Sequence, residues 1–178
     1  MDVPISHIIG TIALIALTAS VAAYFAITVY HTQADILRQQ LAEVSSYVSM
    51  NLMEISTLIN FASFSSNDSV MYKVINLPPD VSGYAYAIEL INEESGGGIL
   101  VRAYLLSRQD IEAHVKLPLE SEANIKIITK DDGKINLSIK GGRIESSGIV
   151  YSGWDGIVVW SWLGAGNPWT GIGILIGG

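Results

Sequence analysis

The feature that most constrains this chain is an uncharged apolar run near its N-terminus. From Ile8 to Tyr30 the sequence reads IIGTIALIALTASVAAYFAITVY, 23 residues without a charged side chain. A helix of that length spans roughly 35 Å, enough to cross the hydrocarbon core of a bilayer. A secretory signal peptide needs a basic flank and a shorter apolar core, whereas the charged side chain before this run is Asp2. We therefore predict a helix of the transmembrane type.

The helical pattern continues beyond the apolar run. Apolar residues recur at steps of three and four along one stripe: Leu37, Leu41, Val44, Val48, Leu52, Ile55, Ile59 and Ala62. Because no Pro or Gly interrupts this stretch, we predict one continuous helix from Ile5 to Ala62, on the order of 80 Å long. The drifting spacing does not favour a dimeric coiled coil. The stripe could pack against the rest of the chain or against neighbouring helices, and the sequence leaves both open.

After the helix the apolar period changes from about 3.6 to two. Alternation of this kind occurs in the segments 84–90, 99–105, 125–127 and 135–140, and 157–163 also resembles a strand. Residues 92–98, Asp131-Asp132-Gly133 and Gly141-Gly142 supply the turn residues expected of hairpins. We predict an α+β chain with a helical part, residues 1–62, and an antiparallel β-sandwich or barrel-like domain, residues 63–178.

The C-terminal end of the chain is uncharged and rich in glycine and tryptophan. All four tryptophans lie between Tyr151 and Gly178. Such an end is expected either to complete the domain's own sheet or to pair with a neighbouring subunit. The residues of this possible interface tail are Trp169, Ile172, Ile174, Leu175 and Ile176.

Composition excludes several classes of function. Charged residues make up only 15% of the chain, the formal net charge is -7, and the ten Lys and Arg residues are scattered. No basic stripe is therefore present for a phosphate backbone, and we predict no nucleic-acid binding. With no cysteine, the chain has neither a disulfide framework nor a thiolate site.

No residue pattern predicts catalysis, a cofactor or a metal. Ser107, Asp110 and His114 have the identities of a nucleophile, an acid and a base, but no nucleophile elbow surrounds the serine. Residues 131–133 begin like a calcium loop, but strand-like alternation follows instead of regularly spaced oxygens. The glycines at 96–98 lack the Lys and Ser or Thr of a phosphate loop. We predict a protein that is not an enzyme.

The segment Ile5-Ser6-His7-Ile8-Ile9-Gly10-Thr11-Ile12-Ala13-Leu14-Ile15-Ala16-Leu17-Thr18 resembles the start of archaeal type IV pilins. The overall plan, a long N-terminal helix before a β domain, is similar as well. The resemblance implies a surface filament whose helices bundle as its core while the β domains form its outside. The resemblance also implies a leader peptide that is removed before Ile5. Only Met1-Asp2-Val3-Pro4 precede Ile5 in this sequence. The chain is therefore expected to be either a mature subunit or a protein that is never cut and stays anchored by its helix.

The resemblance implies that the chain itself is the main partner, through helix bundling, with a membrane as its location before assembly. The residues expected to assemble are Ile5, Ile8, Ile9, Ile12, Leu14, Ile15, Leu17, Val21, Phe25, Leu37, Leu41, Val44 and Val48. Charges near the run, Asp35 and Arg38, hardly set its orientation. Two N-glycosylation sequons, at Asn67 and Asn136, favour an external domain with possible glycans. The alternative is a single-pass accessory or scaffold protein of a pilus or archaellum machine that is not polymerised.

Overall fold

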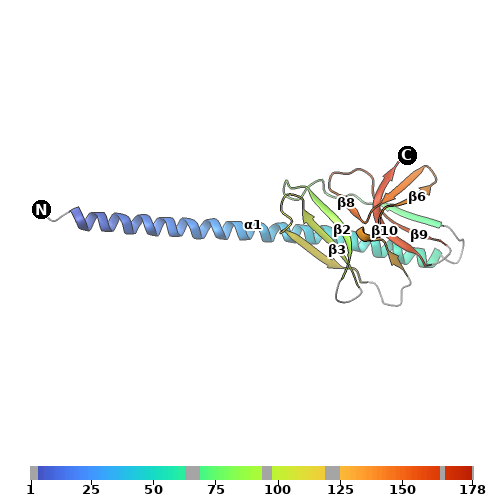
Figure 1. The fold of residues 1–178 in the computed structure, drawn as a ribbon, viewed down its shortest axis with the longest axis horizontal. Coiled ribbons are helices and arrows are strands. Elements are labelled where there is room, and N and C mark those ends of the chain that lie inside the picture. Colours follow the sequence, from blue (N-terminus) through green and yellow to red (C-terminus); the bar gives the residue numbers. More distant parts are fainter. Residues whose placement is uncertain (1–3, 63–68, 94–97, 119–124, 165–166, 178) are drawn as a thin grey trace. The chain divides into compact units, whose positions relative to one another are not determined.

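The computed structural model describes residues 4–62, 69–93, 98–118, 125–164 and 167–177. One long helix, α1 (Pro4–Ala62), precedes a β-rich region, so the predicted α+β class is confirmed (Figure 1). The chain divides into two compact units, Met1–Ile36 and Leu37–Gly178. The second part of α1 therefore belongs to the same unit as the strands. Each unit is described by itself.

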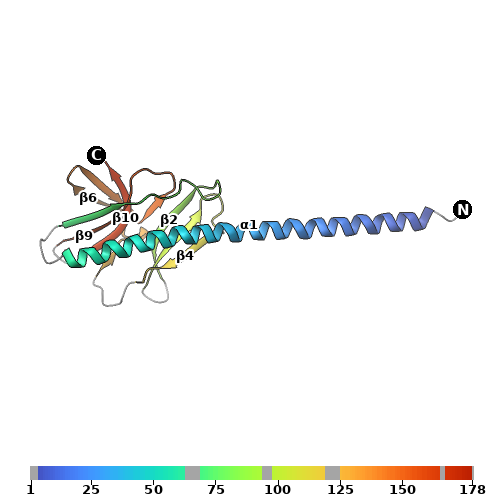
Figure 2. The same ribbon diagram turned by 180° about the vertical axis from the view of Figure 1, so that it is seen from behind.

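The apolar stripe of α1 is buried within the second unit. Leu41, Val48, Leu52 and Ile59 are completely buried, and the remaining stripe residues from Leu37 to Ile55 are nearly so. The Lys73 ammonium lies 2.7 Å from Glu54 and ties this helical segment to the first strand. In Figure 2 the segment lies along the β-rich region. The question that the sequence left open is answered, because the stripe packs against the chain's own β domain.

One sheet has six strands in the order β1-β9-β10-β7-β6, with β5 paired to β10. Their bounds are β1 Ser69–Val74, β5 Lys126–Ile127, β6 Ile135–Ile139, β7 Gly142–Ser146, β9 Ile157–Leu163 and β10 Trp169–Ile176. Its pairs are antiparallel except the short parallel β5–β10 contact. The β6–β7 turn at Gly141-Gly142 is the hairpin that the sequence predicted. Ile128, Ile144, Val158 and Trp160 are buried together against this sheet.

The other sheet has four strands in the order β4-β3-β2-β8. Their bounds are β2 Tyr86–Asn92, β3 Ile99–Leu105, β4 Glu112–Lys116 and β8 Ile149–Tyr151. As predicted, β2 pairs with β3 as a hairpin, with Asn92 opposite Ile99; residues 94–97 of its turn lie outside the described residues. Tyr86, Ile88 and Leu90 alternate onto one completely buried face, as their period of two indicated. Sequence periodicity missed β4, whose residues EAHVK carry too little apolar alternation.

The hairpin predicted at Asp131-Asp132-Gly133 is wrong. Residues Lys130–Asp132 form a short 3-10 helix, η1, while β5 pairs with β10 and β6 pairs with β7. The reason is local capping. The Thr129 N–H donates to Asp132 Oδ2 at 2.9 Å, and the Asp132 N–H donates back to the Thr129 carbonyl at 3.2 Å. The second of these is the backbone bond of the helical turn itself, and the first, to the side chain of Asp132, stabilises that turn where the sequence indicated a strand reversal.

Candidate membrane and assembly segment

The first part of α1 presents large apolar side chains to its surroundings. Exposed fractions are between 47% and 64% for the residues expected to assemble whose side chains are described in this unit: Ile8, Ile9, Ile12, Leu14, Ile15, Leu17, Val21 and Phe25. The side chain of Ile5 lies outside the described residues. Isolated exposed apolar residues are ordinary on soluble proteins, but a continuous surface of this kind marks contact with a membrane or with other proteins.

Five hydroxyl groups of this segment are hydrogen-bonded within the helix. Hydroxyl groups donate to the carbonyl four residues earlier, from Thr11 to His7 and from Thr18 to Leu14, both at 2.8 Å. The same bond is made by Ser20, Thr28 and Thr32. Because an unpaired hydroxyl is costly in an apolar environment, these internal bonds lower the cost of removing the helix from water. These five hydroxyls are therefore compatible with an environment without water.

Small side chains create a shallow hollow on one face of the segment. The hollow has a volume of about 360 Å³ and is lined by Leu14, Ile15, Thr18, Ala19 and Ala22. The last four of these residues follow a spacing of three, one and three, which places them on one helix face. Small residues on such a face allow the backbone of another helix to approach closely.

By length and composition, α1 contains a stretch able to cross a membrane. Its most apolar 18-residue window has a mean hydropathy of 2.2, and none of that window is buried. Leu37, Leu41, Val44 and Val48, which were expected to assemble, differ from the earlier residues because they are buried in the second unit. The apolar stripe from Leu37 onward is thus covered within the second unit, although Tyr47, Met50 and Leu58 of the same helix remain exposed.

The proposed interface tail lies inside the six-stranded sheet. Trp169, Ile172, Ile174, Leu175 and Ile176 all belong to β10, which pairs with β9 over 169–174 and with β7 over 173–176. Of the two partners that the sequence left open, the tail uses the domain's own sheet. Of the two sequons, Asn136 is exposed on β6, and Asn67 lies outside the described residues.

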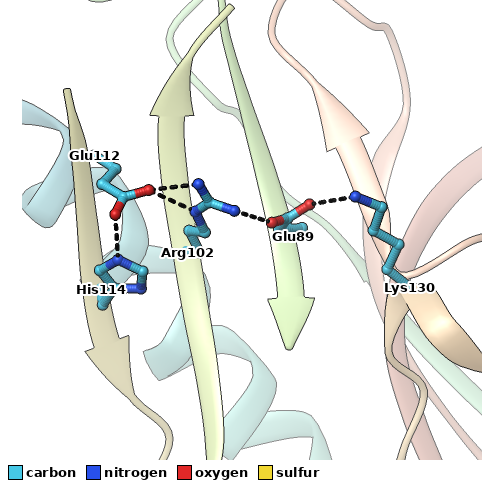
Figure 3. A network of polar contacts seen from close by, with 5 residues as sticks. All are labelled: Glu89, Arg102, Glu112, His114 and Lys130. Carbon is cyan, nitrogen blue, oxygen red and sulfur yellow. Dashed lines mark hydrogen bonds and ion pairs between the residues drawn. The ribbon is translucent and has the colours of Figure 1, made fainter. Parts of the chain in front are cut away.

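A row of charged side chains crosses the four-stranded sheet and reaches η1 (Figure 3). Arg102 on β3 donates through Nη1 to Glu89 Oε1 on β2 at 2.8 Å, and through Nε to Glu112 Oε2 on β4 at 2.8 Å. Lys130 of η1 lies 3.3 Å from the other Glu89 oxygen, and His114 Nε2 lies 3.1 Å from Glu112 Oε1. The row joins three strands and η1 through alternating charges.

The charges in this row stabilise one another. Burial opposes ionisation of Glu112, but hydrogen bonds with His114 and Arg102 outweigh it and lower the pKa of Glu112. The negative charge of Glu89 raises the pKa of Lys130. Glu89 itself is only 2% exposed, so its two cationic partners offset the cost of burying it. In the alternating segment 84–90, Glu89 falls on the face opposite Ile88 and Leu90. The register of the β2–β3 hairpin pairs Glu89 with Arg102, and this register was the signal that could have revealed the contact.

The three residues considered for catalysis have separate roles. His114 contacts Glu112, and Asp110 accepts a hydrogen bond from Arg108 Nη2 at 3.1 Å. Ser107 is exposed in the bend after β3. Among the residues that the structure describes, no group of three or more His, Asp or Glu side chains is placed to hold a metal ion.

In comparisons with known proteins, no family model, curated protein or solved structure matches this chain.

Proposed function

We propose that this chain is a structural subunit of an extracellular filament of the archaeal type IV pilus kind, built by bundling of its N-terminal helices. The observation that carries the proposal is the contrast within α1. Leu17 is 62% exposed, whereas Leu52 on the same helix is completely buried. The second half of the helix holds the β domain, and the first half has an apolar surface left for partners. The β domain then forms the outer surface, displayed for attachment, with Asn136 on it as a candidate glycan carrier.

Assembly would exchange one apolar environment for another. Before assembly, residues 8–30 lie in the cell membrane, and in the filament they contact the same residues of neighbouring copies. Because lipid and helix surfaces are similarly apolar, close packing supplies the driving force. The hollow at Ala19 and Ala22 is where a neighbouring helix can approach most closely. The hydroxyls bonded within the helix can make this transfer without losing a partner.

The proposal is tested on filaments sheared from the native host. Electron microscopy and mass spectrometry of the sheared material should detect polymers that contain this chain. Finding the chain only in membrane fractions would overturn the proposal and favour the alternative, an anchored accessory protein that detergent releases as a monomer or small complex.

A matched pair of variants separates bundling from anchoring. Ala19→Leu fills the hollow and should lower filament yield while the membrane content of the chain stays unchanged. Ala13→Leu adds the same side chain about 120° away from Ala19 around the helix and outside the hollow, and serves as the control for hydropathy. Equal filament yields from both variants would argue against close packing at the hollow.

A further inference from the structure

The free positive charges of this chain are concentrated at one hairpin. All ten Lys and Arg residues lie in the described ranges. Seven of them form ion pairs within the chain, and Arg38 acts electrostatically on Asp110. Within the described part of the chain, Lys140 and Arg143 are left without an ion pair, and both are exposed. In a protein of net charge -7, this distribution marks residues 140–143 as a distinct surface, the cationic tip.

The shape of the cationic tip suits insertion into a recess. Ile139 and Gly142 form the last pair of the β6–β7 hairpin, and Gly141 has a φ of 97°, which glycine adopts without strain. A Cβ on Gly142 would lie 2.1 Å from the Gly177 carbonyl oxygen, so the end of β10 backs the tip closely. Lys140 and Arg143 therefore flank a glycine turn that has no side chain of its own and is supported by the end of β10.

A groove of complementary charge lies elsewhere in the same unit. It has a volume of about 440 Å³, with Glu43, Val44 and Tyr47 of α1 on one side and Pro78, Asp80 and Val81 on the other. Glu43 forms no ion pair among the described residues. Asp80 Oδ1 accepts one hydrogen bond, from the Gly83 N–H at 2.8 Å, and pairs with no cation in the described ranges. We call this site the acidic groove.

The walls of the acidic groove are held in place by specific bonds. The Tyr86 hydroxyl donates to the Pro78 carbonyl at 2.7 Å, and burial followed by the charge of Asp80 raises the pKa of Tyr86 to about 12. Ser82 hydrogen bonds to Gln40 Oε1 at 2.8 Å while its backbone has a φ of 51°. That φ belongs to the two-residue turn Ser82-Gly83, which the Val81–Tyr84 bridge closes and in which positive φ is the usual conformation. The walls of the acidic groove are therefore held in a defined arrangement by these hydrogen bonds.

The two surfaces lie toward opposite ends of the second unit. The bond between Gln40 and Ser82 places the acidic groove where the segment Leu37–Ala62 begins. Strand β6 and the C-terminus lie toward the other end of this segment, as both views show (Figures 1 and 2). A contact between such surfaces on two copies is heterologous, and heterologous contacts that do not close into a ring produce open helical filaments.

We propose that the cationic tip of one copy docks in the acidic groove of the next copy, head to tail, so that Lys140 and Arg143 meet Glu43 and Asp80. This contact rests on the proposed filament function and adds to it a second interface, between β domains. Complementary charges at such a site set the register and select the partner more than they add affinity. The charged contact would therefore set the register between β domains in addition to the packing of the helices.

Charge reversal tests this contact in the full-length chain in the native host. Lys140→Glu with Arg143→Glu should lower filament yield about tenfold or more, because like charges would then face each other. Glu43→Lys with Asp80→Lys should do the same. All four substitutions together should restore filaments, since the complementarity is reversed. Lys134→Glu and Asp155→Lys reverse exposed charges outside both surfaces and should leave the yield unchanged.

Each outcome decides between interpretations. Filament yield is compared with the membrane content and the urea unfolding midpoint of every variant, and Glu43→Gln with Asp80→Asn serves if the lysine variants do not fold. If either charge reversal leaves filament yield unchanged, or if the combined variant does not recover it, the proposed docking is overturned, provided that the wild-type chain still forms filaments. If the acidic groove binds a cationic partner other than a second copy of this chain, all variants should still form filaments, and that result would also overturn the proposed docking. Absence of wild-type filaments overturns the proposed function itself.

Discussion

At the scale of the residue, the most informative side chain is Glu89. It lies on a strand whose apolar face is buried, yet its own side is also almost inaccessible at 2% exposure. A carboxylate in that position is stable only with cationic partners, and Arg102 and Lys130 both contact it. Since Lys130 belongs to η1, Glu89 also connects the sheet to a turn 41 residues later.

Replacing Glu89 by glutamine should destabilise the second unit. The variant keeps the shape of the side chain but leaves Arg102 and Lys130 without their shared anion, and we expect a loss of about 2 kcal/mol in the free energy of unfolding. Urea unfolding of the detergent-solubilised chain, followed by tryptophan fluorescence, measures this loss. Glu93→Gln, which breaks the more exposed contact with Lys116, is the control and should cost about 0–1 kcal/mol. Equal losses in the two variants would contradict a structural role for Glu89.

At the scale of the element, α1 combines two environments in one regular helix. Helical geometry is the same throughout, because hydrogen bonds within the backbone do not depend on what surrounds the helix. What differs is side-chain composition. Apolar residues surround the helix over residues 8–30, whereas from Leu37 onward they follow a single stripe, and that stripe is the part buried by the strands.

Two leucines on this helix should therefore respond very differently to truncation. Leu52→Ala removes a completely buried side chain and should cost about 2–5 kcal/mol of unfolding free energy. Leu17→Ala removes the same atoms from an exposed position and should leave the urea unfolding midpoint of the β domain unchanged. A comparable shift in both variants would show that residues 4–36 contribute to the stability of the domain.

At the scale of the whole molecule, the last strand of the chain stands at the centre of the larger sheet. β10 pairs with β9 on one side and with β7 and β5 on the other. Its Gly173 is closely packed, since a Cβ there would lie 2.5 Å from the Glu145 carbonyl oxygen. The sheet is therefore complete only when the C-terminal residues have been added.

Ending the chain at Pro168 should abolish cooperative folding of the second unit. Without β10, strands β7 and β9 lose the partner between them and the Trp160 side chain loses its cover at Gly171. We expect loss of the sigmoidal urea transition and of near-ultraviolet circular dichroism. Ile176→Ser, at the end of the same strand, should retain a cooperative transition with a modestly lower midpoint. A truncated chain that still unfolds cooperatively would show that β10 is an added strand instead of a central one.

The sequence by itself determined the long helix, the strands at 99–105 and 157–163, and the β2–β3 and β6–β7 hairpins. These features depend on periodicity and turn residues within about 10 to 20 neighbouring positions, so local sequence carries them. Only the tertiary structure decided which surface buries the helical stripe, that β5 lies parallel to β10, and that Glu89 meets Lys130. The β5–β10 and Glu89–Lys130 contacts join residues 43 and 41 positions apart, where many alternative pairings satisfy the same local pattern and the packing of the complete core selects one.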